Sequence, residues 1–348
     1  MITIPVNTGK PYEVKIGGGI LGTAGAEMKK LGLDGKALII SDNNVAPLYA
    51  DTVRQSLAEG GFEVFEYTIP HGEESKNAES LIKILNFAAE NKFIRSDSFV
   101  ALGGGVVGDL CGFAAAVYMR GIHFVQLPTS LLAAVDSSVG GKTAIDLDSG
   151  KNLAGAFYQP EAVICDKDCF NTLPEEEFNN GMAEVIKYGM FCDAELLDKL
   201  SEENDIEQIV ARCVEIKARV VSADEFEKGE RAFLNFGHTV AHAVEVLSGY
   251  KTPHGSAVAI GMAVITKACI EKGICENQAY DKLIPLLEKY NLPYICPYVV
   301  DDIYAAALRD KKNANGKITL VLPTAKGEST LKKCSHEELK EFIMLGLK

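Results

Sequence analysis

Short apolar runs alternate with segments of helical periodicity through the first half of the chain, and this pattern limits the fold more than any other feature. Residues 37–41 (ALIIS), 62–67 and 98–102 predict strands, and residues 47–59 and 78–90 predict the helices between them. Strands separated by helices require crossover connections, which make neighbouring strands parallel and place helices over both faces of the sheet. The pattern predicts an α/β domain of Rossmann-like type with a mostly parallel sheet, in which ligands bind at the carboxyl ends of the strands.

The second half differs, because helical periodicity dominates it. Pro174 stands near a predicted helix start, with acidic residues in the first turn. Only residues 317–322 (KITLVL) predict a strand. We therefore expect an α/β domain at residues 1–172 and a mainly α-helical domain at residues 173–348. The further helices are predicted at residues 195–200, 206–221, 232–247, 256–270 and 278–290.

Length and composition restrict the class of protein. A chain of 348 residues with 47% hydrophobic and 24% charged residues accommodates two globular domains. The net charge of −13 argues against a nucleic-acid partner, and it makes local clusters of Lys and Arg informative as anion sites. The longest weakly polar run, residues 99–119, contains Asp109 and several glycines, so no membrane span is predicted. Nine cysteines without a CxxC pair, and an N-terminus without signal-peptide features, lead us to expect a cytoplasmic protein.

A glycine-rich turn, residues 103–109 (GGGVVGD), follows the third predicted strand. Glycines allow backbone N–H groups to approach a phosphate, and a helix N-terminus attracts negative charge. The turn does not match GxGxxG, so a tight turn packed on the sheet is an equal alternative. Asp42, after the first predicted strand, is suited either to a ribose hydroxyl or to capping the next helix.

Residues 125–160 interleave polar side chains with glycines, which predicts a ligand-lining loop. Residues 140–143 (GGKT) resemble the end of a Walker A motif. Val135 occupies the position where that motif requires a glycine, which excludes a P-loop NTPase.

Three of the six histidines lie between residues 235 and 255. His238 and His242 share one face of a predicted helix, and His254 follows a turn. Imidazoles are common metal ligands, although ordinary histidines on a helix face are an equal alternative, and the spacing does not match HExxH. Glu184 and Lys187, three residues apart, form either a surface ion pair or a buried pair whose carboxylate completes a His2Glu metal site with His238 and His254.

Beyond these separate motifs, most of the chain resembles one known family. The segments GGGVVGD, LPTSLLAAVDSSVGGKTAID, GKNLAGAFYQP, GMAEVIKYG, LNFGHTVAHAVE and the HG at residue 254 occur in the order and spacing of the 3-dehydroquinate synthase family, within the sugar-phosphate cyclases. The resemblance implies an NAD-binding α/β domain, a helical domain and a homodimer. It implies the shikimate pathway of aromatic amino-acid and chorismate biosynthesis.

The resemblance also implies a role for individual residues, with no departure from the family pattern except the mild one of Ser at position 130. The metal ligands would be Glu184, His238 and His254, binding Zn2+ or Co2+. Arg120 would reach the substrate phosphate of the neighbouring subunit. NAD would be bound by Asp42, Glu73, Lys76, Gly104, Gly105, Val106, Asp109, Thr129, Ser130, Lys142, Lys151 and Thr172. The substrate would be lined by Asp136, Lys142, Asn152, Lys187, Lys217, Arg231, Asn235, His242 and Lys312.

The implied reaction explains this set of residues. The family substrate, 3-deoxy-D-arabino-heptulosonate 7-phosphate (DAHP), carries a carboxylate and a phosphate, so an acidic chain needs local cations. The family chemistry is transient oxidation by NAD, β-elimination of phosphate, re-reduction, ring opening and aldol closure, with a metal as Lewis acid. The substrate phosphate is a credible base for the elimination, and His242 is better suited to proton transfer or phosphate contact than to metal ligation. One alternative is an inosose or valiolone synthase, from which the retained Lys217 and Arg231 would distinguish this chain. The others are a metal-dependent polyol dehydrogenase and a non-catalytic NAD sensor.

Overall fold

The computed structural model describes residues 1–202, 205–308 and 317–348. The chain divides into two compact units. Unit 1 comprises Met1–Pro174 with Ile206–Glu225, and unit 2 comprises Glu175–Asp205 with Phe226–Lys348. The segment 206–225, which the sequence analysis assigned to the second domain, therefore clusters with the first unit.

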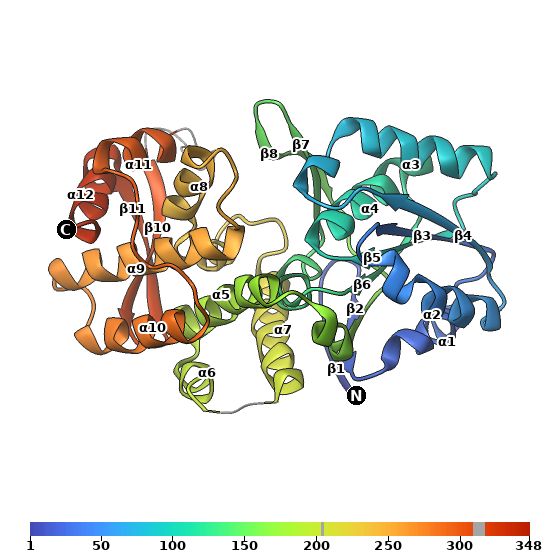
Figure 1. The fold of residues 1–348 in the computed structure, drawn as a ribbon, viewed down its shortest axis with the longest axis horizontal. Coiled ribbons are helices and arrows are strands. Elements are labelled where there is room, and N and C mark those ends of the chain that lie inside the picture. Colours follow the sequence, from blue (N-terminus) through green and yellow to red (C-terminus); the bar gives the residue numbers. More distant parts are fainter. Residues whose placement is uncertain (203–204, 309–316) are drawn as a thin grey trace. The chain divides into compact units, whose positions relative to one another are not determined.

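Unit 1 is built on a seven-stranded sheet with the order β1-β2-β9-β6-β5-β3-β4 (Figure 1). β1 pairs antiparallel with β2, and the other pairs are parallel. This confirms the expected α/β class. The strands are β1 (Ile2–Val6), β2 (Tyr12–Gly17), β3 (Lys36–Asp42), β4 (Glu63–Ile69), β5 (Ser98–Gly103), β6 (His123–Pro128) and β9 (Ala162–Asp166).

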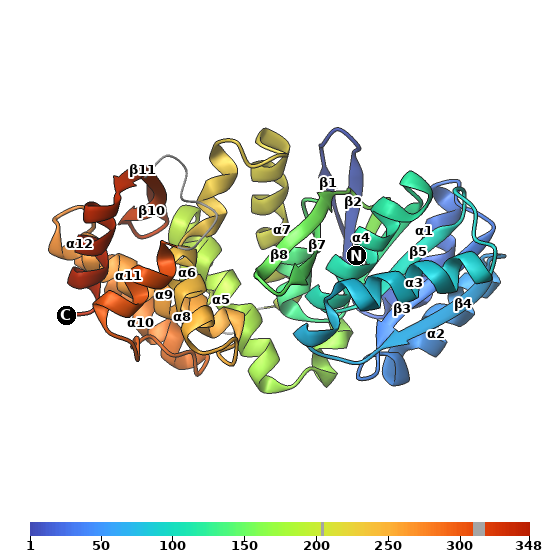
Figure 2. The ribbon, with the colours of Figure 1, turned by 90° about the horizontal axis from the view of Figure 1, so that it is seen from above.

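Helices cover both faces of this sheet because its strands are apolar on both sides. In β3, Leu38 and Ile40 pack under α3 and α4, whereas Ala37 and Ile39 pack against α1 and α2. Figures 1 and 2 show α3 beside α4. The helices of unit 1 are α1 (Ala24–Lys30), α2 (Ala46–Glu59), α3 (Ala78–Glu90), α4 (Gly105–Val117) and α7 (Ile206–Ala223). Short 3-10 turns lie at Ile20–Thr23, Glu73–Ser75, Tyr118–Arg120 and Lys167–Thr172.

Residues 125–160 do not form the single loop that their composition predicted. After β6, Ala133–Ser137 forms a π-helical turn. Two strands, β7 (Lys142–Leu147) and β8 (Gly150–Phe157), then pair as an antiparallel hairpin. The hairpin is half exposed and packs on α4, so its strands lack the continuous apolar character by which a buried strand is identified in a sequence.

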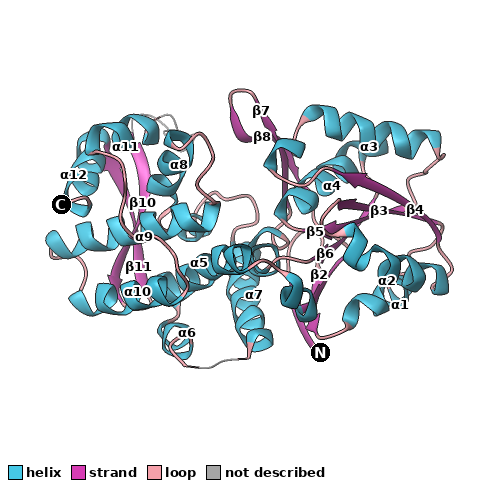
Figure 3. Cartoon of the chain, in the orientation of Figure 1, coloured by secondary structure: helices cyan, strands magenta, loops and turns pink. Residues whose placement is uncertain are grey.

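Unit 2 is mainly helical, as predicted, and its described residues include a two-stranded hairpin (Figure 3). α9 (His254–Glu271) is buried around most of its circumference and packs against α5, α8, α10 and α12. The hairpin consists of β10 (Lys317–Ala325), which was predicted in part, and β11 (Glu328–Ser335), which was not. The other helices are α5 (Glu175–Cys192), α6 (Ala194–Lys199), α8 (His238–Leu247), α10 (Asn277–Lys289), α11 (Val300–Ala307) and α12 (His336–Gly346).

The helix predicted at residues 232–247 is wrong in its first part. The structure has a 3-10 turn at Glu230–Asn235, and α8 begins only at His238. Gly237 interrupts the helix with φ of 79°, and a Cβ at this position would lie 2.9 Å from the backbone nitrogen of Met262. Only glycine combines this conformation with so close an approach to α9. The break makes His238 the first residue of α8.

Among the described residues, no helix has both the length and the apolar composition needed to cross a membrane.

Candidate functional site

Glu184, His238 and His254 converge in unit 2, and their side chains offer donor atoms that all lie within 4.8 Å of one another. Glu184 comes from the middle of α5, whereas the two histidines begin α8 and α9. Oε1 of Glu184 lies 3.7 Å from Nε2 of His238 and 3.4 Å from Nε2 of His254. Ligands of a tetrahedral Zn2+, at ~2.0–2.1 Å from the ion, are about 3.3 Å apart, so the donor set fits one such metal.

The convergence depends on a close approach of α9 to α5. A Cβ at Gly255 would lie 2.1 Å from the carbonyl oxygen of Asn180. Asn180 lies one turn before Glu184, and its Oδ1 accepts hydrogen bonds from the backbone N–H (3.0 Å) and the hydroxyl of Ser256 (3.2 Å). These contacts place His254, at the start of α9, beside Glu184 of α5.

Both imidazoles present Nε2 to Glu184 because Nδ1 of each ring faces another acceptor. Nδ1 of His238 lies 3.0 Å from the carbonyl oxygen of Phe236, and Nδ1 of His254 lies 3.3 Å from Oε1 of Glu245. A neutral imidazole protonated at Nδ1 has its lone pair on Nε2, the state that a metal ligand requires.

Charges in this cluster are buried. The Glu184 side chain is 0% exposed and the Lys187 side chain 1%, and the two form an ion pair. The structure therefore supports the buried alternative for this pair rather than the surface one. Burial opposes protonation of His254, but the carboxylates of Glu184 and Glu245 outweigh it and raise the pKa of His254 to about 10.

His242 lies beside the cluster without joining it. Its ring makes an edge contact with the ring of His238, with centroids 5.6 Å apart. His242 is partly exposed, and no donor atom of it belongs to the three-residue group. From spacing alone, both His238 and His242 had remained candidate metal ligands, because they share one helix face.

Two further expected substrate residues lie in the 3-10 turn before α8. Arg231 is buried, and Asn235 donates from Nδ2 to Oε1 of Glu227 at 2.9 Å. Neither Glu227 nor Glu245 was predicted from the sequence. Glu245 follows His238 by seven residues, a helical spacing that puts both residues on one face of the helix. This spacing was the signal in the sequence that could have identified Glu245. Lys312 lies outside the described residues.

In unit 1, several expected NAD-binding residues share the carboxyl edge of the parallel sheet. The chain passes from β3 to β4 on one side of β3 and then to β5 on the other, so the strand order reverses between β3 and β5. Crevices at such reversals bind ligands in α/β sheets. Asp42 ends β3, and Gly104, Gly105 and Val106 follow β5 at the start of α4, whose N-terminus has no side-chain cap. Thr129 and Ser130 follow β6.

Asp42 makes the local contacts that the capping alternative predicted. Its Oδ1 accepts from the backbone N–H groups of Asn44 (2.8 Å) and Val45 (3.0 Å), just before α2. These contacts leave the role in ribose binding as a prediction.

Lys76 is the centre of a second polar group. Its buried ammonium lies 2.5 Å from Oδ2 of Asp109 and 2.6 Å from Oδ1 of Asn152. Glu73 lies near both Lys76 (3.9 Å) and Lys151 (3.7 Å). Burial disfavours the ammonium form, but the carboxylates of Asp109 and Glu73 hold the pKa of Lys76 above its usual value. The structure thus brings five expected site residues together.

Lys217 lies on α7, which belongs to unit 1. Its ammonium donates to the carbonyl oxygen (2.6 Å) and to Oδ1 (2.7 Å) of Asp136 in the π-helical turn. The helix α7 also packs against β1 and β2, in keeping with the clustering of residues 206–225 with unit 1.

The other expected residues of unit 1 are Thr172, Lys142 and Arg120. Thr172 ends a 3-10 turn, and its hydroxyl lies 2.5 Å from that of Tyr49, a residue that the sequence analysis missed. Lys142 is exposed at the start of β7. Arg120 is exposed in a turn where Met119 and Arg120 both have positive φ, 49° and 67°. Such backbone is uncommon for non-glycine residues.

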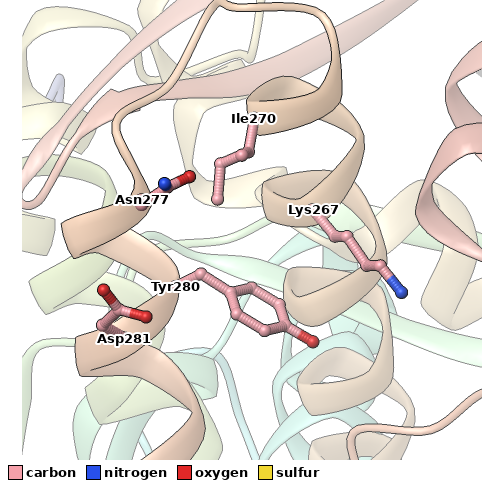
Figure 4. Close-up of a pocket in the computed structure, with 5 residues that line it drawn as sticks. All are labelled: Lys267, Ile270, Asn277, Tyr280 and Asp281. Carbon is pink, nitrogen blue, oxygen red and sulfur yellow. The ribbon is translucent and has the colours of Figure 1, made fainter.

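A surface pocket of about 290 Å³ lies elsewhere in unit 2 (Figure 4). Lys267 and Ile270 of α9 line it together with Asn277, Tyr280 and Asp281 of α10. None of the expected site residues that the structure describes contributes to it, so the buried carboxylate–imidazole cluster remains the candidate site.

Comparisons with known proteins identify the family of the chain. The family model described as "3-dehydroquinate synthase N-terminal" matches residues 66–180, and "3-dehydroquinate synthase C-terminal" matches residues 181–313. A 3-dehydroquinate synthase of Pelobacter propionicus is 46% identical, covering 97% of this chain and 98% of that protein. One of Streptococcus suis is 44% identical, covering 96% and 97%.

Solved structures show the same fold. A 2-deoxy-scyllo-inosose synthase complexed with carbaglucose-6-phosphate, NAD+ and Co2+ has a TM-score of 0.87 at 24% identity, with 99% of each chain covered. With both family models matched in sequence and with these relatives similar over nearly their whole length, the chain belongs to the 3-dehydroquinate synthase family.

Proposed function

We propose that the chain is a 3-dehydroquinate synthase, a carbon–oxygen lyase that converts DAHP into 3-dehydroquinate and phosphate in the shikimate pathway. The observation that carries this proposal is 44% and 46% identity to proteins of that name over nearly the full length of both chains. The buried cluster of Glu184, His238 and His254 supports it independently, because the reaction requires a metal.

Glu184, His238 and His254 would hold one divalent metal. Two neutral imidazoles and one carboxylate suit Zn2+ or Co2+ and leave coordination positions open for substrate oxygens. When bound, the metal supplies Lewis acidity at the substrate hydroxyl that is oxidised. Lys187 neutralises Glu184 within the same buried environment.

The carboxyl edge of the sheet in unit 1 would bind NAD. The uncapped N-terminus of α4 offers backbone N–H groups to the pyrophosphate, and Asp42 lies at the strand-order reversal where a ribose is expected. Lys76 and Asp109 would hold the surrounding loops through their ion pair. When bound, NAD would take up a hydride and return it within each turnover, so that the cofactor is regenerated. The proposed contacts also include Glu73, Thr129, Ser130, Lys142, Lys151 and Thr172.

Cationic and amide side chains would bind the two anionic groups of the substrate. Lys187, Lys217 and Arg231 are all buried, where a charge attracts an anion more strongly than it does in water. His242 lies next to a metal ligand but outside the ligand group, which suits it to move a proton or contact the phosphate. The other proposed substrate contacts are Asp136, Lys142, Asn152, Asn235 and Lys312.

We further propose a cytoplasmic homodimer in which Arg120 contacts the phosphate bound by the neighbouring subunit. The exposure of Arg120 on a turn with positive φ supports this role, since unusual backbone is maintained at functional sites. The nine cysteines include no CxxC pair, which suits a reducing compartment.

A single assay tests the proposed activity. The purified chain is incubated with DAHP, catalytic NAD+ and either Zn2+ or Co2+, and phosphate and 3-dehydroquinate are followed together. We expect both products in equal amounts, without accumulation of NADH.

Other outcomes would assign other activities. NADH formed in proportion to substrate, without phosphate, would identify a polyol dehydrogenase. Turnover of a hexose 6-phosphate that lacks the carboxylate, without turnover of DAHP, would identify a different sugar-phosphate cyclase. Binding of NAD without any turnover would indicate a sensor.

A further inference from the structure

We propose that Glu245 is a positioning residue of the metal centre: its carboxylate accepts a hydrogen bond from His254 and thereby determines which ring nitrogen His254 presents to a metal. This inference rests on the metal site of the proposed function and adds a residue outside its ligand set.

The two nitrogens of His254 face two different carboxylates. Nδ1 lies 3.3 Å from Oε1 of Glu245, and Nε2 lies 3.4 Å from Oε1 of Glu184. Glu245 is 5% exposed, so few water molecules can compete for its carboxylate, whereas the His254 side chain is 34% exposed. Because a carboxylate only accepts hydrogen bonds, Glu245 holds the proton on Nδ1, so that the proton displaced when a metal binds is the one on Nε2, which faces the ligand cluster.

The other histidine of the cluster, His238, has a different kind of acceptor at its Nδ1. Its Nδ1 also faces an acceptor, but that acceptor is the backbone carbonyl oxygen of Phe236 at 3.0 Å. A neutral carbonyl orients the ring, whereas a carboxylate also increases the basicity of the imidazole and so strengthens its bond to a metal. Of the two acceptors, only that of His254 can be changed by a side-chain substitution.

Glu245 also holds the loop that leads to His254, but it does so through its main chain. Its carbonyl oxygen accepts from the backbone N–H of Tyr250 (2.7 Å) and from the hydroxyl of Ser248 (2.9 Å). The Ser248 hydroxyl in turn accepts from the backbone N–H of Thr252 at 3.1 Å. Since these bonds do not involve the carboxylate, side-chain variants of Glu245 separate the contact to His254 from the anchoring of the loop.

The experiment measures Co2+ binding by the full-length chain. Wild type, Glu245→Gln, Glu245→Ala and Ser248→Ala are stripped of metal and titrated with Co2+ against a chromophoric chelator, and the visible absorption of bound Co2+ is recorded. We expect Glu245→Ala to weaken Co2+ binding about 10–100-fold. Glu245→Gln, which keeps an acceptor but removes the charge, should weaken it less and shift the Co2+ absorption bands.

Ser248→Ala is the matched control, because it loosens the same loop and leaves the carboxylate in contact with His254. We expect it to keep the wild-type affinity and spectrum. Thermal unfolding of each metal-free variant establishes that it is folded, and if Glu245→Ala is not, the isosteric Glu245→Gln decides.

Wild-type affinity and spectrum in both Glu245 variants would overturn the inference and leave the proposed metal site intact. Equal weakening by Ser248→Ala and Glu245→Ala, with unchanged spectra, would also overturn it and assign the effect to the loop. Absence of Co2+ binding by wild type would overturn the metal site itself, and this inference with it.

Discussion

Nε2 of His254 lies 3.4 Å from Oε1 of Glu184, although one residue begins α9 and the other lies in the middle of α5. Glu184 is fully buried, and a buried carboxylate must be balanced by nearby positive charge. Lys187 provides one such charge, and a metal between the imidazoles would provide another.

Glu184→Gln should abolish stoichiometric metal binding, because it replaces the charged ligand by a neutral amide of the same shape. Wild type at a metal concentration 100 times its Kd should gain about 2.7 kcal/mol in the free energy of unfolding. Metal analysis after gel filtration, together with thermal unfolding with and without Zn2+, measures both effects. A Glu184→Gln variant that is stabilised by Zn2+ as much as wild type would contradict the assigned ligand.

His242→Ala should reduce kcat about 10²–10⁴-fold while the metal content stays at the wild-type level. The reason is that His242 lies outside the three-residue donor group and is suited to proton transfer, a contribution of this order. Parallel measurement of turnover and bound metal checks the prediction. If the metal is lost with His242, the residue is a ligand and the assignment is wrong.

Gly255→Ala should weaken metal binding and lower the free energy of unfolding by roughly 1–3 kcal/mol or more. The added Cβ would lie 2.1 Å from the carbonyl oxygen of Asn180, so α9 must move away from α5 and carry His254 with it. Gly22→Ala is the control, since a Cβ there meets no atom within 4 Å. Equal metal affinity in the two variants would show that the close approach of the helices is not required.

Lys76→Met should destabilise the chain and weaken NAD binding, because it leaves Asp109 beside an apolar side chain. Removing one partner of a buried ion pair costs about 3–5 kcal/mol, and the partial exposure of Asp109 puts this pair at the lower end. Lys83→Met is the control: Lys83 pairs with Glu79 at 2.6 Å on the exposed face of α3 and should have little effect. Urea unfolding and NAD titration measure the two consequences. Similar effects of both substitutions would refute a special role for the buried pair.

The contribution of Glu27 to stability should depend on pH. Hydrogen bonds from Lys15 and Lys30 lower the pKa of Glu27 below its usual value of 4.5. A lowered pKa in the folded state means that the stabilisation is fully present above pH 4.5 and is lost as the pH falls through the lower, folded-state pKa. Glu27→Gln should therefore unfold roughly 1–3 kcal/mol more easily than wild type at pH 7.

Below about pH 4 this difference should shrink. Thermal unfolding of both proteins between pH 3 and pH 7 tests the dependence, with the exposed Glu90→Gln as control. A difference that stays constant with pH would show that the charge of Glu27 does not matter.

Part of the α/β unit could be predicted from local pattern, while β1, β2, β6 and β9 were not predicted. The helix predicted at residues 78–90 is α3, with the same bounds, and the three predicted strands are β3, β4 and β5. Buried parallel strands read as continuous apolar runs, so their signal lies within the segment itself. The strands β7, β8 and β11 gave no such signal, because each is partly exposed and its pairing depends on a neighbouring strand.

For the candidate site, the types of residue were visible in the sequence, and the family resemblance implied their roles. Histidines at positions 238, 242 and 254, and a carboxylate at 184, indicated metal chemistry, but helical spacing would have paired His238 with His242. The chain itself determined the fold class, the glycine-rich turn and the set of ionisable side chains. Only the tertiary structure decided that α9 approaches α5 at Gly255, that His254 and not His242 faces Glu184, and that Glu245 accepts from Nδ1 of His254, because these contacts join helices whose proximity no local pattern encodes.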